Sequence, residues 1–309
     1  MEMRKVLNNE LKRLMGLDPN IVILDADLAK ANGTWDLREI YPDRVFEAGV
    51  AEQNMVTMAA GLASYGFIPV CGSFTPFITR RVCDQVAISV CYAGMNVKLL
   101  GTDEGIAAEL NGGTHMSVED ISVLRGIPDI VIFSPADNIE LEKAIEPIIY
   151  YDGPVYIRMQ RKVVPDIHDS NYEFDLFKAD VVKEGKDVTI ASMGGIMPQE
   201  VLEAIELLAS DGIDVEYINV HTVKPLDEET LLKSIKKTGC LVTCDNHNVI
   251  GGLGSALAEM SARNYPVPIE MIGIQDHFGE VGYLPYLKEK FHMTAKDIAS
   301  AAKKAVAGK

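Results

Sequence analysis

The sequence has 309 residues, enough for about two domains of the usual size, and its 48% hydrophobic content can fill substantial cores. A formal net charge of −16 argues against nucleic acid and anionic membranes as partners. The five cysteines are odd in number, form no CxxC pair and mostly lie in apolar runs, so we expect reduced thiols, a cytoplasmic protein and no cysteine-bound metal. The first 17 residues predict a charged amphipathic helix without the apolar core of a signal peptide.

Strand and helix signals alternate through the first half of the chain. After the N-terminal helix, the pattern predicts strands at 20–24, 44–46, 67–71, 96–100, 130–133 and 155–159. The helices are expected from Glu52 to just before Gly66 and at 80–93, 118–124 and 139–149. Because these strands are apolar throughout and alternate with helices, we expect a parallel sheet covered on both faces.

The alternation stops over residues 164–180, where Pro, His, Asp, Ser and Asn residues predict an interdomain linker. It then restarts, with strands expected at 188–191, 215–220, 241–244 and 269–273 and helices at 198–210, 227–237, 255–263, 284–291 and 295–306. We therefore expect two doubly wound α/β domains, the first over residues 1–163 and the second over residues 181–309.

Glu52 stands in the first turn of a predicted helix whose residues Met55, Val56, Met58 and Ala59 make it apolar nearly all round, which is typical of a core helix. A helix N-terminus tolerates a carboxylate because free backbone N–H groups point at it. Burial acts in the opposite direction and raises a carboxyl pKa. A carboxyl whose pKa is subject to both effects can share a proton with a basic ring nitrogen. The simpler interpretation is that Glu52 only caps its helix, since acidic first turns are common.

The sequence around Glu52, GVAEQNM, resembles the pyrimidine-domain motif of the thiamine-diphosphate enzymes related to transketolase. That superfamily includes transketolases, deoxyxylulose-phosphate synthases and the beta subunits of 2-oxo acid dehydrogenases. The resemblance implies that Glu52 is catalytic and hydrogen-bonds N1′ of the cofactor's aminopyrimidine. Further on, VHTVKPLDEETLL, NHNVIGGLGSALAE and DHFGEVG resemble the family's C-terminal domain. The resemblance covers almost the whole chain and implies a parallel-sheet pyrimidine-binding domain followed by a smaller, mixed-sheet C-terminal domain.

Four residues match positions that hold the cofactor or lie beside it in this family. Phe74 and Phe77, in SFTPF, supply two rings just after a predicted strand, and aromatic rings offer a rigid flat face. Two phenylalanines alone are more often core residues, but beside the Glu52 motif they match the pyrimidine-stacking aromatics. Leu28, in ADLAKAN, matches the apolar residue that helps to hold the bent cofactor, and Asp27 precedes it.

Three further residues match the family's substrate contacts. His115, in NGGTH, corresponds to a histidine that reaches the donor substrate or its phosphate. Its place on a glycine-rich loop before a helix suits proton transfer or anion binding, so we also expect it to be catalytic, although a loop histidine in solvent is an equally good interpretation of the pattern alone. Arg161, in YIRMQRK, and Arg4 match phosphate-binding arginines. Guanidinium groups bind phosphate or sulfonate bidentately, but each arginine by itself is typical of a solvated surface.

Four positions depart from the transketolase pattern. Ala31 replaces a serine that touches the substrate phosphate, Asn111 an aspartate that contacts a sugar hydroxyl, and Asp103 a histidine. Arg80 replaces an aromatic residue and is a candidate anion contact. We retain Asn111, Asp103 and Arg80 as candidate substrate-binding residues, and the departures allow an unusual sugar, either non-phosphorylated, sulfonated or branched.

Enzymes of this family bind Mg²⁺ and the cofactor's diphosphate through a GDG…N motif, and no GDG occurs in this sequence. The resemblance therefore implies the C-terminal, beta-type subunit of a split transketolase, which moves a two-carbon ketol unit from a ketose (phosphate) to an aldose. An N-terminal-half partner would supply the ligands of Mg²⁺ and diphosphate in an α2β2 complex. The alternatives are a beta subunit of a 2-oxo acid dehydrogenase, half of a deoxyxylulose-phosphate synthase, and a non-catalytic assembly subunit. The retained Glu52, Phe74 and Phe77 argue against the last.

Overall fold

A computed structural model describes residues 1–309, which form two compact α/β units. The first unit holds residues 1–104 and 123–176, and the second holds residues 105–122 and 177–309. The predicted domain limits at 163 and 181 stay predictions. None of the helices combines the length and the apolar character needed to cross a bilayer.

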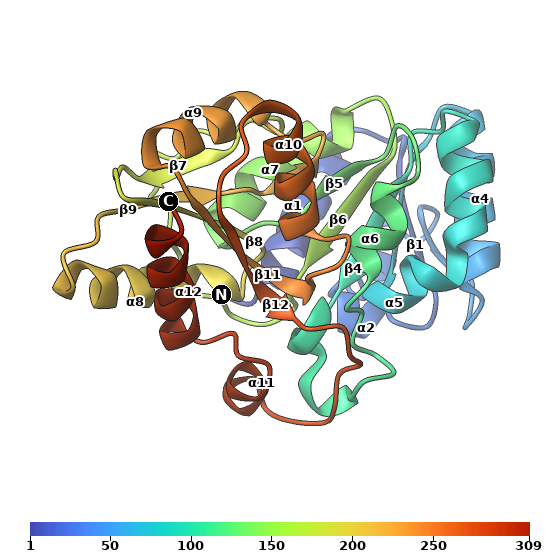
Figure 1. Ribbon diagram of the computed structural model, residues 1–309. Coiled ribbons are helices and arrows are strands. Elements are labelled where there is room, and N and C mark those ends of the chain that lie inside the picture. The colour runs from blue at the N-terminus through green and yellow to red at the C-terminus, as the bar shows by residue number, and fades with distance from the viewer. The chain divides into compact units, whose positions relative to one another are not determined.

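The first unit is built on parallel strands in the order β5-β6-β4-β3-β1-β2 (Figure 1). The strands are β1 (Ile21–Asp25), β2 (Val45–Glu47), β3 (Ile68–Phe74), β4 (Lys98–Thr102), β5 (Val131–Phe133) and β6 (Val155–Met159). The helices are α1 (Met3–Leu17), α2 (Ala29–Asn32), α3 (Leu37–Ile40), α4 (Glu52–Ser64), α5 (Thr75–Ile78), η1 (Arg80–Val82), η2 (Gln85–Tyr92) and α7 (Asn138–Tyr150). The short helix α6 (Asp120–Arg125) crosses the boundary between the units.

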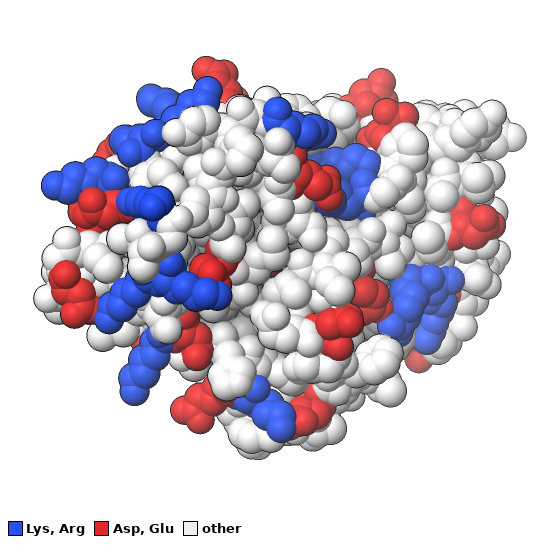
Figure 2. Space-filling view, viewed as in Figure 1, with Lys and Arg blue, Asp and Glu red and all other residues white.

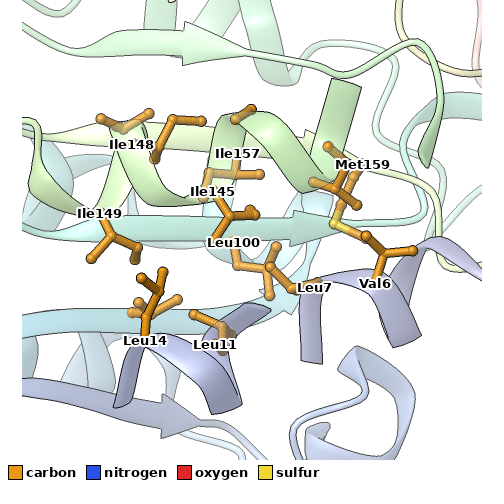
Figure 3. Close-up of a cluster of buried hydrophobic side chains, with 14 of the residues drawn as sticks. Val6, Leu7, Leu11, Leu14, Leu100, Ile145, Ile148, Ile149, Ile157 and Met159 are labelled. Carbon is orange, nitrogen blue, oxygen red and sulfur yellow. The ribbon is translucent and has the colours of Figure 1, made fainter. Parts of the chain in front are cut away.

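The core of the first unit lies where α1 and α7 cover the sheet (Figure 3). Leu7, Leu11 and Leu14 recur every three to four residues along α1, so they share one face of that helix, and all are buried. Figure 3 shows these leucines in one cluster with the isoleucines of α7, Leu100 of β4 and Ile157 of β6. Burying each such side chain contributes roughly 1.5–3 kcal/mol.

Two helices differ from the sequence prediction. Helix α4 is not buried all round, because Gln53, Asn54 and Thr57 are exposed and Met58 is 37% exposed. The apolar pattern failed here because the small residues Ala59 and Ala60 face the core while the larger Met58 faces outward. The single helix expected at 80–93 is instead the 3₁₀-helix η1 followed by the π-helix η2.

The second unit has a five-stranded mixed sheet in the order β12-β11-β8-β9-β7, in which only β7 runs antiparallel to its neighbour. Its strands are β7 (Asp180–Lys183), β8 (Val188–Met193), β9 (Val215–Asn219), β11 (Leu241–Asn248) and β12 (Ile269–Ile274), with the short β10 (Thr222–Lys224) in addition. The helices are η3 (Gly105–Asn111), α8 (Met197–Ser210), α9 (Glu228–Thr238), α10 (Leu253–Asn264), α11 (Leu284–Lys290) and α12 (Ala295–Ala307). The predicted fold class, one parallel and one mixed α/β sheet, is thus confirmed.

Asp25, the last residue of β1 in the first unit, has a buried carboxyl. Asp25 accepts hydrogen bonds from Asn32 Nδ2 at 2.8 Å and from Thr34 Oγ1 at 2.5 Å, and Asn32 Oδ1 in turn accepts one from Thr102 Oγ1 at 2.9 Å. Burial raises the pKa of Asp25 from 3.8 to about 6, although its two hydrogen bonds lower the pKa in part. The folded carboxyl therefore keeps its proton to a higher pH than the unfolded one.

We expect Asp25 to favour the folded state at low pH and to lower stability as the pH rises from about 4 through 6. Asp25→Asn removes the charge and keeps hydrogen-bonding capacity, so the wild type should lose about 2 kcal/mol more than this variant between about pH 4 and pH 7. The chain's single tryptophan, Trp35, lies in the first unit, so its fluorescence during urea unfolding measures this difference. The exposed Asp43→Asn is the control, and equal pH dependence in Asp25→Asn and the wild type would contradict the prediction.

Candidate functional site

Most of the candidate residues of the first unit gather at one edge of its sheet because its strands are parallel. Phe74 is the last residue of β3, and Asp103 directly follows β4. Arg161 comes two residues after β6, and Asp27 two residues after β1. The carboxyl ends of parallel strands meet at the same edge, where open α/β sheets form their binding crevices.

Glu52 is buried, with 3% of its surface exposed, although it is the first residue of α4. Its Oε1 accepts a hydrogen bond from Arg81 Nη1 at 2.6 Å. The guanidinium of Arg81 also stacks over the ring of Phe77, with Cζ 3.9 Å from the ring centre. A single planar cation therefore contacts both the predicted catalytic carboxylate and one of the two predicted aromatic faces.

Phe74 and Phe77 form a tilted pair whose ring centres are 6.2 Å apart. Phe74 is buried, Phe77 is half-buried, and the guanidinium carbon of Arg161 lies 4.9 Å from the centre of the Phe74 ring. The two rings thus connect the Glu52–Arg81 pair to Arg161.

Arg161, which is half-buried, forms an ion pair with the buried Asp103. Arg161 Nε donates to Asp103 Oδ2 at 2.7 Å, and Arg161 Nη2 contacts the same oxygen. Asp103 is 1% exposed and has a left-handed backbone, with φ 59°. Asp103, a candidate substrate-binding residue, is therefore paired with Arg161, the arginine expected to bind the substrate's anionic group.

Arg4 lies beside Arg161, because its backbone N–H donates to the Arg161 carbonyl at 3.4 Å. Its Nε donates to Glu2 Oε2 at 3.0 Å, and this contact lowers the pKa of Glu2. Nη1 of Arg4 lies 3.3 Å from the Lys30 carbonyl and 3.4 Å from the Ala31 carbonyl. Arg4 also lines a cleft of about 520 Å³, whose other walls include Lys5, Asn8, Lys30 and Trp35.

Asp27 and Leu28 lie on the loop after β1. Asp27 has a left-handed backbone, with φ 58°, and its N–H donates to Glu47 Oε1 at 2.6 Å. The same Glu47 oxygen accepts from Gly49 N–H at 2.9 Å, so Glu47 ties this loop to the start of the Glu52 motif. Asp27 is exposed and Leu28 is half-buried.

The structure places Asn111 and His115 in the second unit, whereas Arg80 lies exposed in the first. Asn111 is exposed at the end of η3, and His115 Nδ1 lies 3.0 Å from Thr114 Oγ1. This segment is tied to the rest of its unit by the Leu284 N–H, which donates to Glu109 Oε1 at 2.8 Å.

Arg81 is a site residue that the sequence motifs did not single out. Two signals were available: Arg81 directly follows Arg80, and it lies four residues after Phe77, a spacing that puts two side chains on the same helical face. Chemically, the edge of the sheet offers a buried carboxylate, an aromatic face and two arginines with carboxylate partners. These groups can hold a planar, protonatable ring and a nearby anion.

Comparisons with known proteins agree with this chemistry. Residues 1–166 match the family "Transketolase, pyrimidine binding domain", and residues 177–298 match "Transketolase, C-terminal domain". The chain is 54% identical to a 6-deoxy-6-sulfo-D-fructose transketolase subunit of Clostridium sp. (strain MSTE9), over 92% of this chain and 88% of that protein. It is 38% identical to one of the apulose-4-phosphate transketolase subunits of Actinobacillus succinogenes, over 76% of each. A solved structure of a split-gene transketolase, in an inactive beta4 tetramer, has a TM-score of 0.91 and 38% identity and covers 100% of this chain and 99% of that one.

Proposed function

The chain belongs to the transketolase family, and we propose that it is the C-terminal, beta-type subunit of a split transketolase. In this function it transfers a two-carbon ketol unit from a ketose donor to an aldose acceptor with thiamine diphosphate. The single observation that carries the proposal is the continuous set of contacts Glu52–Arg81–Phe77–Phe74–Arg161. These contacts join the carboxylate and the rings expected to hold the cofactor to the arginine expected to bind the substrate's anion.

The residues present fit the aminopyrimidine of thiamine diphosphate. Glu52 is buried, and the planar cation of Arg81 contacts both its carboxylate and the ring of Phe77, so these groups can receive a planar ring that carries a proton. When bound, the cofactor supplies the carbanion chemistry of ketol transfer. Glu52 would share a proton with ring nitrogen N1′, while Phe74 and Phe77 fix the ring's plane. Asp27 and Leu28 would support the cofactor from the loop after β1.

The donor is a ketose with an anionic end group. Arg161 and Arg4 would bind that group, and His115, Asn111 and Arg80 would contact the sugar or its anion. The relative with 54% identity is a 6-deoxy-6-sulfo-D-fructose transketolase subunit, which makes a sulfonated ketose the first donor to test. A sulfonate presents three hydrogen-bond acceptor oxygens, and guanidinium groups suit such oxygens.

The partner is an N-terminal-half transketolase subunit. The sequence has no GDG motif, and two of the similar proteins carry the word subunit in their names. We propose an α2β2 complex in which the partner supplies the ligands of Mg²⁺ and of the diphosphate.

Arg161→Ala and His115→Ala should each weaken donor use in the reconstituted complex. The loss of one charged hydrogen bond costs about 1.5–3 kcal/mol, which is a roughly tenfold to hundredfold fall in kcat/KM. Cofactor affinity, measured by calorimetry, should stay within about twofold of the wild type, because neither residue contacts the cofactor in the proposed arrangement. The exposed Asp43→Asn serves as the control. Wild-type kinetics in both variants, with every donor that the wild type accepts, would place the anion site elsewhere.

A further inference from the structure

The ion pair between Arg161 and the buried Asp103 sets the charge of the proposed anion site. Asp103 is 1% exposed, and its Oδ2 accepts from Arg161 Nε and contacts Nη2, so a negative charge is fixed beside the guanidinium. Arg has five N–H donors, so this contact leaves donors for a ligand. Any headgroup that Arg161 binds therefore lies near a carboxylate that water screens poorly.

Arg4, the second arginine of the site, is also paired with a carboxylate. Arg4 Nε donates to Glu2 Oε2 at 3.0 Å, and both side chains are only about one-third exposed, at 31% and 32%. The segments that carry Arg4 and Arg161 run side by side, joined by a hydrogen bond from the Arg4 N–H to the Arg161 carbonyl. Lys5 lies 3.9 Å from Glu2 and is 68% exposed, so solvent screens its charge.

Paired charges as such are common on this protein. On the face drawn in Figure 2, many Lys and Arg side chains lie beside Asp or Glu, and exposed pairs of this kind contribute little to stability. The Arg161–Asp103 pair differs because its carboxylate is buried and because Arg161 lies next to the ring of Phe74, within the contacts that define the site.

A phosphate monoester carries a charge of about −1.5 to −2 at pH 7. A sulfonate has the same tetrahedral arrangement of three oxygens but a single negative charge. The carboxylate of Asp103 repels each ligand in proportion to the ligand's charge, so this repulsion weakens the binding of the phosphate more than that of the sulfonate. We propose that Asp103, assisted by Glu2, makes this site select a singly charged sulfonate over a phosphate dianion at the end of the donor sugar. This proposal rests on the proposed function.

The test uses the complex of the full chain with its N-terminal-half partner. It compares kcat/KM for 6-deoxy-6-sulfo-fructose, for fructose 6-phosphate and for uncharged erythrulose. Asp103→Asn removes the charge and keeps the size, and Asn tolerates the left-handed backbone at this position. The phosphate-to-sulfonate ratio of kcat/KM should rise about tenfold to hundredfold. The use of uncharged erythrulose measures any loss of activity that does not depend on the anionic end group. Glu2→Gln should shift the ratio in the same direction but less, because its pair is more exposed.

The exposed Asp43→Asn controls for the loss of one negative charge outside these pairs and should leave the ratio unchanged. An unchanged ratio in Asp103→Asn, with erythrulose use retained, would overturn the proposal, and so would a wild type that prefers the phosphate. If Asp103→Asn loses erythrulose use through misfolding, the phosphate-to-sulfonate ratio in Glu2→Gln tests the proposal instead, and an unchanged ratio there would overturn it. A wild-type complex that transfers ketol units from none of the three donors would contradict the proposed function itself.

Discussion

Replacing Glu52 by Gln should lower the turnover of the reconstituted complex by about 10²–10⁴, which is the usual size of acid–base assistance. The amide keeps the shape of the carboxyl and can still form a hydrogen bond, but it cannot share a proton with the ring nitrogen. The fold should survive, because the residue before α4 makes no side-chain cap and Arg81, which pairs with Glu52, is 42% exposed. Steady-state ketol transfer from the donor that the wild type uses best measures the effect.

Glu229→Gln is the matched control for this change. Glu229 is also a first-turn glutamate, in α9, but it is exposed and lies outside the site. Removing a first-turn charge typically changes stability by about 0.3–1 kcal/mol through the helix dipole and should not affect turnover. If Glu52→Gln behaves like Glu229→Gln, with a small stability change and normal turnover, the capping interpretation of Glu52 is correct.

The isolated chain should bind thiamine diphosphate weakly and show no ketol transfer, and addition of the N-terminal-half partner should restore both properties. The proposed ligands of diphosphate and Mg²⁺ belong to the partner. Loss of two or more charged contacts, each worth about 1.5–3 kcal/mol, weakens binding by roughly 10²–10⁴. Titration calorimetry with Mg²⁺ on the chain alone, the partner alone and the mixture compares the three affinities. Tight, Mg²⁺-dependent binding by the chain alone would show that the diphosphate site lies in this chain.

The sheet and the aromatic pair of the site could be predicted from the sequence because both depend on local patterns. Apolar runs such as 155–159 coincide with the observed strand β6. Phe77 follows a strand as expected, whereas β3 extends beyond the predicted 67–71 and ends with Phe74. Strand β7, at 180–183, has no counterpart among the predicted strands. Its residues are half-buried or exposed, so it lacks the continuous apolar run that indicated the other strands.

The pairing of charges could not be predicted in the same way. Asp103 and Arg161 are 58 residues apart, and they meet because β4 and β6 are neighbours in the sheet. Glu52 and Arg81 are 29 residues apart and meet through the packing of α4 near η1. Family resemblance marked Arg161 as an anion ligand and Asp103 as an altered substrate contact. Only the strand order brings the carboxylate of Asp103 against the guanidinium of Arg161.

The most direct test of the proposed function is the exchange of the cofactor's C2 proton for deuterium, followed by NMR in the reconstituted complex. This exchange reports proton removal at C2 without any sugar substrate, so it is independent of the anion site. We predict rapid exchange in the wild type, and exchange slower by about 10²–10⁴ in Glu52→Gln, in step with turnover. Exchange at the wild-type rate in Glu52→Gln would show that Glu52 only caps its helix and would contradict its catalytic role.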